Sequence, residues 1–344
     1  MSGLTYIKRG LFQTIRGKVH FKLHTSKIIR GIYVKFRGIA RTQWDEQGKK
    51  NEPNIRYHGE HKYFTEALNL VGEGMDNSVE LLPGEHNYKF AYVLPVGLPT
   101  SFKSPHGNIT YSVTGVIDVS WDFNLEAEAK LVVVSPINLN KRAGLKRPGY
   151  VKATKHLWWL CPSGPITIEV NIPKTGYVSS EIIHVITEIR NQSNARITMI
   201  EYRIDQKIAY YAEYPRRNVK ELASSLYTTH FPGTPAYTIK HSDEFIKIPD
   251  MIVVNFSNCD LFDVQQNLKV ILHIQGFHTN LTAKIPIKLG HISITLENTS
   301  RIPVSMTAGL NTPYPCGTEE RASNLHVLGR VYSEERYRYG WWLQ

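Results

Sequence analysis

Apolar and polar residues alternate with a period of two along residues 109–122. One face carries Ile109, Tyr111, Val113, Ile117, Val119 and Trp121, and the other carries Thr110, Ser112, Thr114, Asp118, Ser120 and Asp122. This period predicts a long β-strand with one buried face. The preceding residues 94–107 contain Pro95, Pro99 and Pro105, which have no amide hydrogen to donate, so a shaped loop is predicted there. A proline loop that leads into a half-buried strand favours a β-sandwich.

The same alternation returns along most of the chain. The further segments are 19–24, 32–37, 88–94, 129–134, 166–172, 182–190, 268–274 and 281–289. Residues 198–212 are a polar and apolar mixture that predicts a strand at a sheet edge, and residues 215–235 predict a long loop. No persuasive amphipathic helix precedes residue 137. We therefore predict an all-β fold with two β-sandwich domains in tandem.

Breaks in the alternation predict the domain boundaries. Residues 1–137 form the first domain, residues 138–155 a linker and residues 156–292 the second domain. Residues 293–344 lose the alternation and predict a flexible tail, whose aromatic end at 337–344 is either a docking element or a segment that packs back or stays disordered.

Positive charge is concentrated in the first half of the chain. The net charge of the 344 residues is +11, and residues 1–160 hold 23 Lys and Arg against 13 Asp and Glu. The candidate anion- or membrane-binding residues are Lys141, Arg142, Lys146, Arg147, Lys152 and Lys155, within a linker that carries no acidic residue. An excess of this kind suits anionic membrane lipid or a phosphorylated tail, although a solvated surface and connector is the simpler explanation.

Signatures of catalysis and of metal binding are missing from the sequence. There is no GxSxG elbow, P-loop, HExxH or EF-hand loop, so we predict neither an enzyme nor a cofactor. Cys161, Cys259 and Cys316 are far apart and form no CxxC pair, which favours a reduced cytosolic protein. His58 and His61 stand three apart, and a β-strand does not place such a pair on one face. No apolar run reaches 18 residues, so no membrane-spanning helix is predicted.

Many separate motifs share one family pattern. They are 17–19 (GKV), 30–40 (RGIYVKFRGIA), Trp44, 57–64 (YHGEHKYF), 84–95 (GEHNYKFAYVLP), 98–102 (LPTSF), 107–111 (GNITY), 163–166 (SGPI), 176–178 (GYV), Glu181, 188–193 (EIRNQS) and 285–290 (IPIKLG). Together these motifs resemble the arrestin fold, and more narrowly the alpha-arrestin (arrestin-domain-containing) family. The resemblance covers roughly residues 12–292. It implies immunoglobulin-like β-sandwiches, and it shifts the expected role of residues 94–102 from binding toward fixing the end of the first sandwich.

The resemblance implies an adaptor and not an enzyme. Such a protein binds cytoplasmic tails of membrane receptors or transporters, at the plasma membrane or endosomes, and links them to endocytic sorting and ubiquitination. Nucleic acid is not an expected partner. A retromer-type coat subunit with the same fold, held in a stable trafficking complex, is the alternative.

One position and one missing motif depart from the family pattern. Ser180 stands at a turn where the family usually has Gly. The sequence contains no PPxY motif, and residues 311–314 and 234–237 match it only in part. The resemblance therefore gives little ground for a ubiquitin ligase recruited through that motif.

Overall fold

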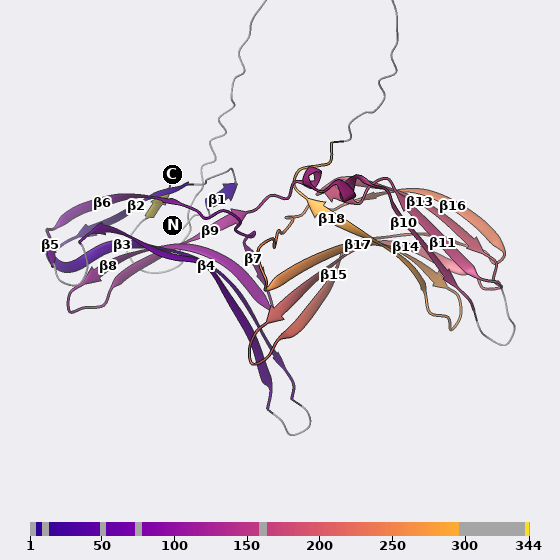
Figure 1. The fold of residues 1–344 in the computed structure, drawn as a ribbon, viewed down its shortest axis with the longest axis horizontal. Helices are drawn as coiled ribbons and strands as arrows, with labels where there is room; N and C mark the ends of the chain where they lie inside the picture. The colour runs from indigo at the N-terminus through magenta and orange to yellow at the C-terminus, as the bar shows by residue number, and fades with distance from the viewer. Residues whose placement is uncertain are drawn as a thin grey trace, which may run out of the picture.

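A computed structural model describes residues 5–8, 14–48, 53–72, 78–157, 164–295 and 341–343 of the chain. Its strands form two domains that lie side by side along the longest axis (Figure 1). The first domain contains β1 (Thr5–Lys8), β2 (Thr14–Leu23), β3 (Lys27–Glu46), β4 (Ile55–Val71), β5 (Val79–Leu81), β6 (Gly84–Val93), β7 (Phe102–Ser104), β8 (Gly107–Val119) and β9 (Leu125–Val134). The second contains β10 (Gly149–Lys155), β11 (Ile166–Ile172), β12 (Gly176–Val178), β13 (Ile182–Asn191), β14 (Ile197–Ala212), β15 (Asn218–Thr234), β16 (Thr238–Lys247), β17 (Phe262–Ile274) and β18 (Leu281–Gly290).

The first domain is a sandwich of two sheets. One sheet has the order β1-β9-β8-β3-β4, with β5 on β3 and β7 on β8, and the other has the order β19-β2-β6, where β19 is Trp341–Leu343. The alternation in β3 explains the layering, because Val34 and Phe36 are buried while Lys35 and Arg37 are exposed. The Phe36 ring stacks at 4.0 Å on Tyr92 of the facing sheet. Burial of one face on each sheet therefore holds the sandwich together.

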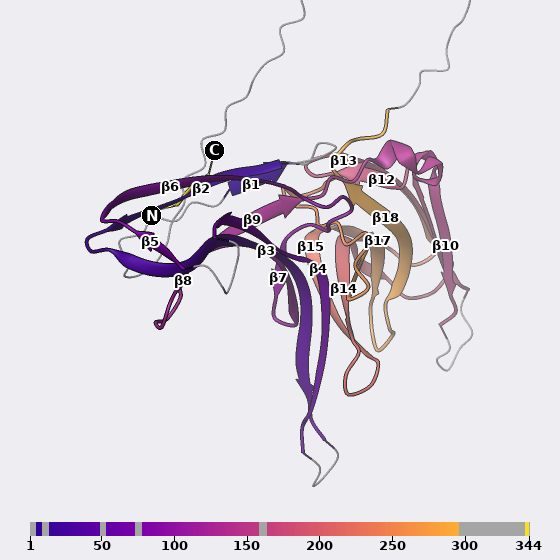
Figure 2. The ribbon, with the colours of Figure 1, turned by 60° about the vertical axis from the view of Figure 1, so that its left-hand side comes forward.

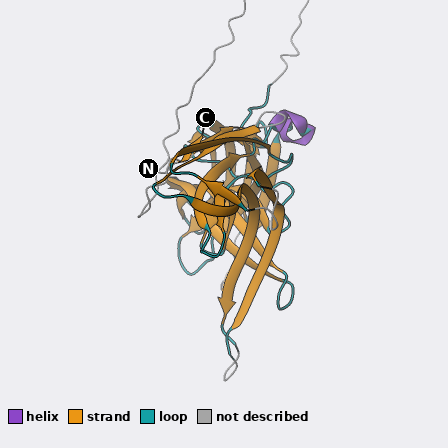
Figure 3. Cartoon of the chain, turned by 90° about the vertical axis from the view of Figure 1, so that its left-hand side faces the viewer, coloured by secondary structure: helices purple, strands orange, loops and turns teal. Residues whose placement is uncertain are grey.

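The second domain repeats this architecture with other strands. Its sheets have the orders β10-β11-β13-β16 and β12-β18-β17-β14-β15. Its core is rich in β-branched residues such as Ile168, Val185 and Val270, which suit a pleated surface. Figure 3 shows that strands make up most of the described chain, with helical ribbon at the short 3-10 turns η1 (Leu139–Lys141) and η2 (Ala143–Lys146). The all-β prediction is confirmed.

Three local predictions were wrong. Most of the predicted loop 215–235 is the long strand β15 (Asn218–Thr234), and β14 is an interior strand between β15 and β17 instead of an edge. The reason is that β15 is itself the edge, so most of its side chains face solvent and show no apolar period. Trp121 was predicted on the buried face, yet β8 ends at Val119 and Trp121 is fully exposed in the following turn, with φ of 65°.

The segment between the domains is shorter than the predicted linker. Residues 138–148 hold η1 and η2, while Gly149–Lys155 is strand β10 and pairs antiparallel with β11. Ser180 lies in the turn between β12 and β13 with φ of 65°, the conformation in which glycine is favoured. Of the predicted tail, residues 296–340 and 344 lie outside the described residues, and Trp341–Leu343 pairs with β2.

The proline loop 94–101 joins the two domains. The Thr100 N–H donates to the Asn255 carbonyl at 2.8 Å, and the Thr100 hydroxyl accepts from the backbone N–H groups of Ser135 and Asn255 at 3.1 and 3.3 Å. The Asn258 amide donates to the Gly97 carbonyl at 3.0 Å. The leucines of the loop are buried. Its predicted packing role is confirmed, and the structure adds that the second domain supplies several of its partners.

Aromatic rings continue this contact into the core of the first domain. Phe102 packs edge-on against Phe256 and Phe262 at 5.0 and 5.7 Å between ring centroids, and Tyr210 packs against Phe262 at 5.6 Å. A Cβ on Gly107 would lie 2.6 Å from the Arg41 carbonyl oxygen and 2.8 Å from the Phe262 ring, so a side chain there would clash with both. Burial of several rings in one cluster strongly stabilises the contact between domains.

Two long hairpins, β3–β4 and β14–β15, meet at the same junction. The outer parts of β3 and β4 project beside β14 and β15 (Figure 2). The Thr42 hydroxyl donates to the Tyr211 carbonyl at 2.6 Å, and the Arg216 guanidinium donates to the Tyr57 hydroxyl at 3.2 Å. A Cβ on Gly59 would lie 3.0 Å from Thr42 Oγ1 and 3.2 Å from the Tyr211 carbonyl oxygen. We call this set of contacts, from the proline loop to the hairpins, the domain seam.

We predict that Thr100→Val lowers the free energy of unfolding by about 1–3 kcal/mol, because two buried backbone N–H groups lose their acceptor while the side-chain volume stays the same. Denaturant unfolding measures the loss. Thr110→Val, at an exposed position on β8, is the control and should change stability by less than about 0.5 kcal/mol. Equal effects of the two substitutions would contradict the role of Thr100.

Candidate binding surfaces

A hollow of about 600 Å³ lies on the first domain, on the face of the large sheet that points away from β2 and β6. Residues from four neighbouring strands line it: Lys35, Arg37, Lys62, Thr65, Ser112, Thr114, Glu126 and Glu128. Their position follows from the alternation, because the residues between them fill the sandwich core. We call this hollow the first-domain groove.

Charges of both signs line the first-domain groove. Lys35 forms an ion pair with Glu126 at 3.6 Å, and Lys62 forms one with Glu60 at 3.5 Å. Arg37 is exposed and makes no ion pair within the described part of the chain. A free guanidinium offers five N–H donors in a planar fork that matches a carboxylate or a phosphate. The groove is therefore suited to a polar ligand that carries an acidic group.

The six predicted anion-binding residues do not form one patch. Lys141 ends η1, Arg142 lies between η1 and η2, Lys146 ends η2 and Arg147 follows it, beside the end of the second domain. Lys152 lies on β10 and pairs with Glu169 at 2.8 Å. The Lys155 ammonium, at the far end of the same strand, is bonded to the carbonyl and hydroxyl of Thr279.

The first four of these residues form a compact basic set, which we call the basic turns. Lys141, Arg142 and Arg147 are exposed, and Lys146 is half-buried. Lys288 of β18 lies close enough to Arg142 for its charge to matter: burial lowers the pKa of Lys288, and Arg142 lowers that pKa further. These four cations lie within seven consecutive residues, so their grouping was visible in the sequence, and the structure places them on and beside two short 3-10 turns.

His291 connects the basic turns to the end of β18. Its ring Nδ1 accepts a hydrogen bond from the Ile137 backbone N–H at 3.0 Å, and the His291 backbone N–H donates to the Ile137 carbonyl at 2.9 Å. Burial lowers the pKa of His291, and a hydrogen bond with the Val253 backbone opposes this in part. The neutral ring is therefore the form that the fold favours.

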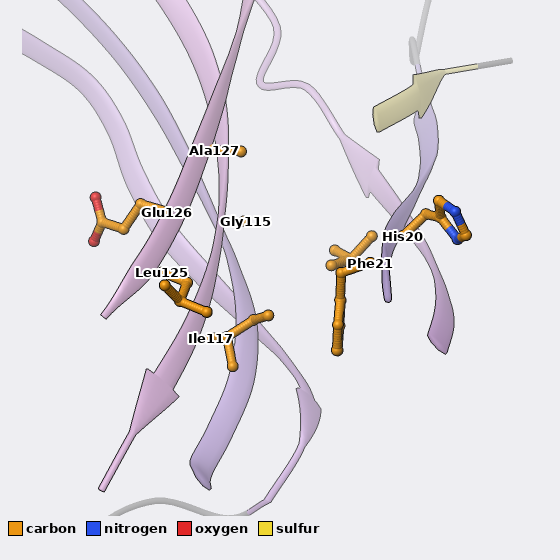
Figure 4. A pocket seen from close by; sticks show the side chains of 8 residues that line it. His20, Phe21, Gly115, Ile117, Leu125, Glu126 and Ala127 are labelled. Carbon is orange, nitrogen blue, oxygen red and sulfur yellow. The ribbon is translucent and has the colours of Figure 1, made fainter. Parts of the chain in front are cut away.

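A small cavity lies between the sheets of the first domain. It encloses about 20 Å³, which is room for roughly one water molecule. Figure 4 shows that Phe21, Ile117 and Leu125 point into it, while Glu126 and His20 point away. Its size and apolar wall make it a packing defect and exclude it as a site for a larger ligand.

Other site types find no support within the described ranges. No group of three or more His, Cys, Asp or Glu side chains there could hold a metal ion. His58 stacks on Tyr214 across the domain seam, at 5.5 Å between ring centroids, and His61 packs beside Tyr63. No helix in this part of the chain is long and apolar enough to cross a membrane.

Comparison with known proteins identifies both sandwiches. The family model described as "Arrestin (or S-antigen), N-terminal domain" matches residues 5–140, and the one described as "Arrestin (or S-antigen), C-terminal domain" matches residues 162–294. The chain belongs to the arrestin family. The resemblance drawn from the motifs is confirmed, and the two arrestin domains meet at the domain seam described above.

Several curated relatives are named arrestin domain-containing proteins. Arrestin domain-containing protein 1 of Rattus norvegicus is 26% identical over 331 residues, which cover 94% of this chain and 71% of that protein. The Homo sapiens protein of the same name is 26% identical over 293 residues, with 84% and 63% covered. Arrestin domain-containing protein 17 of Caenorhabditis elegans is 27% identical over 296 residues, with 81% and 67% covered. The matched region thus spans about two thirds of these relatives' own length.

The groove of the N-terminal arrestin domain was missed as a candidate site in the sequence. Lys35 and Arg37 do alternate with buried residues on β3, so their exposure was predictable. Their meeting with Lys62 of β4 and Glu126 of β9 depends on strand order, which the sequence did not provide. Same-face charged residues on several neighbouring strands were the signal available.

We predict that His291 makes the stability of the two-domain chain depend on pH. Its folded pKa lies below the ordinary value of about 6.5, so its contribution is complete above that pH and is lost as the pH falls toward the folded pKa. His291→Asn keeps an acceptor near the position of Nδ1 and does not titrate. The drop in Tm between about pH 7.5 and about pH 5.5 should be smaller in this variant than in the native chain. A drop of the same size in both would contradict the prediction.

Proposed function

We propose that this chain is an arrestin-like adaptor that binds the cytoplasmic tails of membrane receptors or transporters and links them to endocytic sorting and ubiquitination. The protein acts by binding and not by catalysis, in the cytoplasm and at the surface of the plasma membrane or endosomes. The relatives' names state only that they contain arrestin domains. The proposal therefore goes beyond the family assignment and rests on the surfaces of this chain.

The observation that carries the proposal is the first-domain groove with its free Arg37. A groove of about 600 Å³ accepts a few residues of an extended segment rather than a folded domain. Arg37 and the adjacent Lys62 favour an acidic or phosphorylated residue in that segment, since guanidinium and ammonium groups pair with anions. Glu126 and Glu128 at the β9 side disfavour a second acidic residue there. A cytoplasmic tail with one local acidic cluster fits this distribution.

The basic turns support contact with a membrane. Four cations on or beside two short turns, three of them exposed, would face anionic lipid with little cost in desolvation. Attraction of this kind adds to cargo binding, because the membrane holds the cargo tail nearby. The ubiquitin ligase of such a pathway would have to be recruited by a route other than a PPxY motif.

We predict that Arg37→Glu weakens binding of acidic cargo-tail peptides by about tenfold or more, because the replacement sets a carboxylate against the acidic segment. Fluorescence anisotropy with labelled tails of membrane receptors and transporters measures the dissociation constants. Arg16→Glu changes the net charge equally on β2, an exposed position of the other sheet, and serves as the control. Full binding by the Arg37 variant, or equal loss in both variants, would remove the groove from the proposal.

We predict that the basic turns bind anionic vesicles in a salt-dependent way. Replacement of Lys141, Arg142, Lys146 and Arg147 by Ala should lower binding to vesicles that contain phosphatidylserine by about tenfold or more, since each cation near the surface contributes about 1 kcal/mol. Rising salt should lower binding of the native chain steeply. Vesicles of phosphatidylcholine provide the neutral control. Unchanged binding after the fourfold replacement would rule out the basic turns as the membrane contact.

A further inference from the structure

The outer edge of strand β16 is open. β16 is the last strand in the order β10-β11-β13-β16, and it pairs only with β13 among the described strands. Figure 1 shows it at the outer rim of the second domain, far from the first domain. Every second residue of such an edge presents backbone N–H and C=O groups outward, so an open edge of ten residues is a template for another strand.

The sequence of β16 is complementary to its own reverse. Three residues precede Ser242 and three follow it, in the order Ile239, Lys240, His241, Ser242, Asp243, Glu244, Phe245. His241 and Asp243 flank Ser242, and Lys240 and Glu244 lie one residue further out on either side. The outermost pair, Ile239 and Phe245, is apolar. Such a pattern matches a second identical strand that runs in the opposite direction.

We propose that two copies of this chain associate edge to edge through β16, as antiparallel strands related by a two-fold axis at Ser242. Ile239 then lies opposite Phe245 of the second copy, Lys240 opposite Glu244, His241 opposite Asp243, and Ser242 opposite itself. The axis repeats each of the first three pairs. Two sheets of four strands join into one continuous sheet of eight across the dimer.

The positions of Ile239, Lys240, Glu244 and Phe245 in the single chain agree with this pairing, while His241 and Asp243 also contact Glu188 and His184 of the neighbouring strand β13. Ile239 and Phe245 lie on the outer face of the sheet and are 62% and 68% exposed. On the inner side, Glu244 is half-buried, and it forms no ion pair or hydrogen bond within the described part of the chain. The Lys240 ammonium donates to the Pro232 carbonyl at 2.5 Å, so it already lies at the open side of the sandwich. Burial raises the pKa of Glu244. Lys240 of the same chain lowers that pKa through its charge but forms no ion pair with Glu244, and the second copy would supply a cation in direct contact.

The charges also specify the register. When the two-fold axis passes through a residue, the inward-facing side chains of one copy lie opposite inward-facing side chains of the other. An axis between two residues would mix the two faces. The nearest alternative registers are therefore those centred on His241 and on Asp243. An axis at His241 places Ile239 opposite Asp243. An axis at Asp243 places two carboxylates opposite each other. The register centred on Ser242 is the one in which all close pairs are complementary.

Inward-pointing charges on an edge strand usually prevent pairing with other strands. On β16, Lys240 and Glu244 would prevent pairing with strands of most other sequences, while they attract the same strand of a second copy. The adjacent edge strand β15 provides a contrast, because its charged residues Lys220 and Glu221 lie near one end and have no counterpart near the other. The complementary pattern belongs to β16 and is not a general property of the edges in this domain.

Charge exchange tests the proposal on the full chain. Sedimentation over a concentration series should show a monomer–dimer equilibrium. Lys240→Glu sets two acidic pairs across the axis, and Glu244→Lys sets two basic pairs, so each variant should raise the dimer dissociation constant by about tenfold or more. The double variant, K240E with E244K, restores the opposite pairs and should dimerise as the native chain does.

A mixture of the two single variants gives the sharpest result. The acidic edge of one faces the basic edge of the other, so the mixture should form a heterodimer although each variant is monomeric by itself. This outcome also shows that both variants are folded. Lys247→Glu, on the same strand beyond the paired residues, is the control and should leave the equilibrium unchanged. A native chain that stays monomeric up to its solubility limit, or single variants that dimerise as well as the native chain, would overturn the proposal.

Discussion

The arrangement of the two arrestin domains depends on the contact between the proline loop and the segment that precedes β17. Thr100 bonds to the backbone of Asn255 in both directions, so the loop cannot leave without exposing buried polar groups. The Phe102, Phe256 and Phe262 rings extend this polar contact with apolar area. The hydrogen bonds fix how the two domains align, because a buried donor without its acceptor is costly. The rings supply most of the stabilisation, because burial of apolar area is favourable without a strict direction.

The seam also fixes the positions of the solvent-facing surfaces relative to one another. It holds the β3–β4 and β14–β15 hairpins side by side, and Gly59 permits that approach because it has no side chain between them. The first-domain groove lies on one side of this junction, and the basic turns lie where the chain enters the second domain. A cargo tail held in the groove and a membrane contacted by the basic turns would therefore keep a fixed distance and orientation relative to each other. The open edge of β16 lies at the far end, where a second copy would not compete with either surface.

Much of the fold could be predicted from the sequence, because burial of one sheet face imposes a period of two. The strand up to Val119 followed from that period, and the packing role of residues 94–102 followed from the resemblance to the arrestin fold. The prediction failed where no face is buried: β15 is a solvated edge and has no apolar period, and Trp121 lies past the end of its strand. The binding surfaces were harder still. Arg37 acquires its neighbours through strand order, and the six predicted cations separate because turns and a strand carry them to different places.

The central claim is that the domain seam makes the two arrestin domains one cooperative unit. Differential scanning calorimetry of the full chain tests this most directly, by comparing the calorimetric enthalpy of unfolding with the van't Hoff enthalpy. A seam with buried hydrogen bonds and shared aromatic packing predicts a single transition in which the two enthalpies agree. Two separate transitions, or one broad transition whose calorimetric enthalpy clearly exceeds the van't Hoff value, would contradict it and show that each domain unfolds independently.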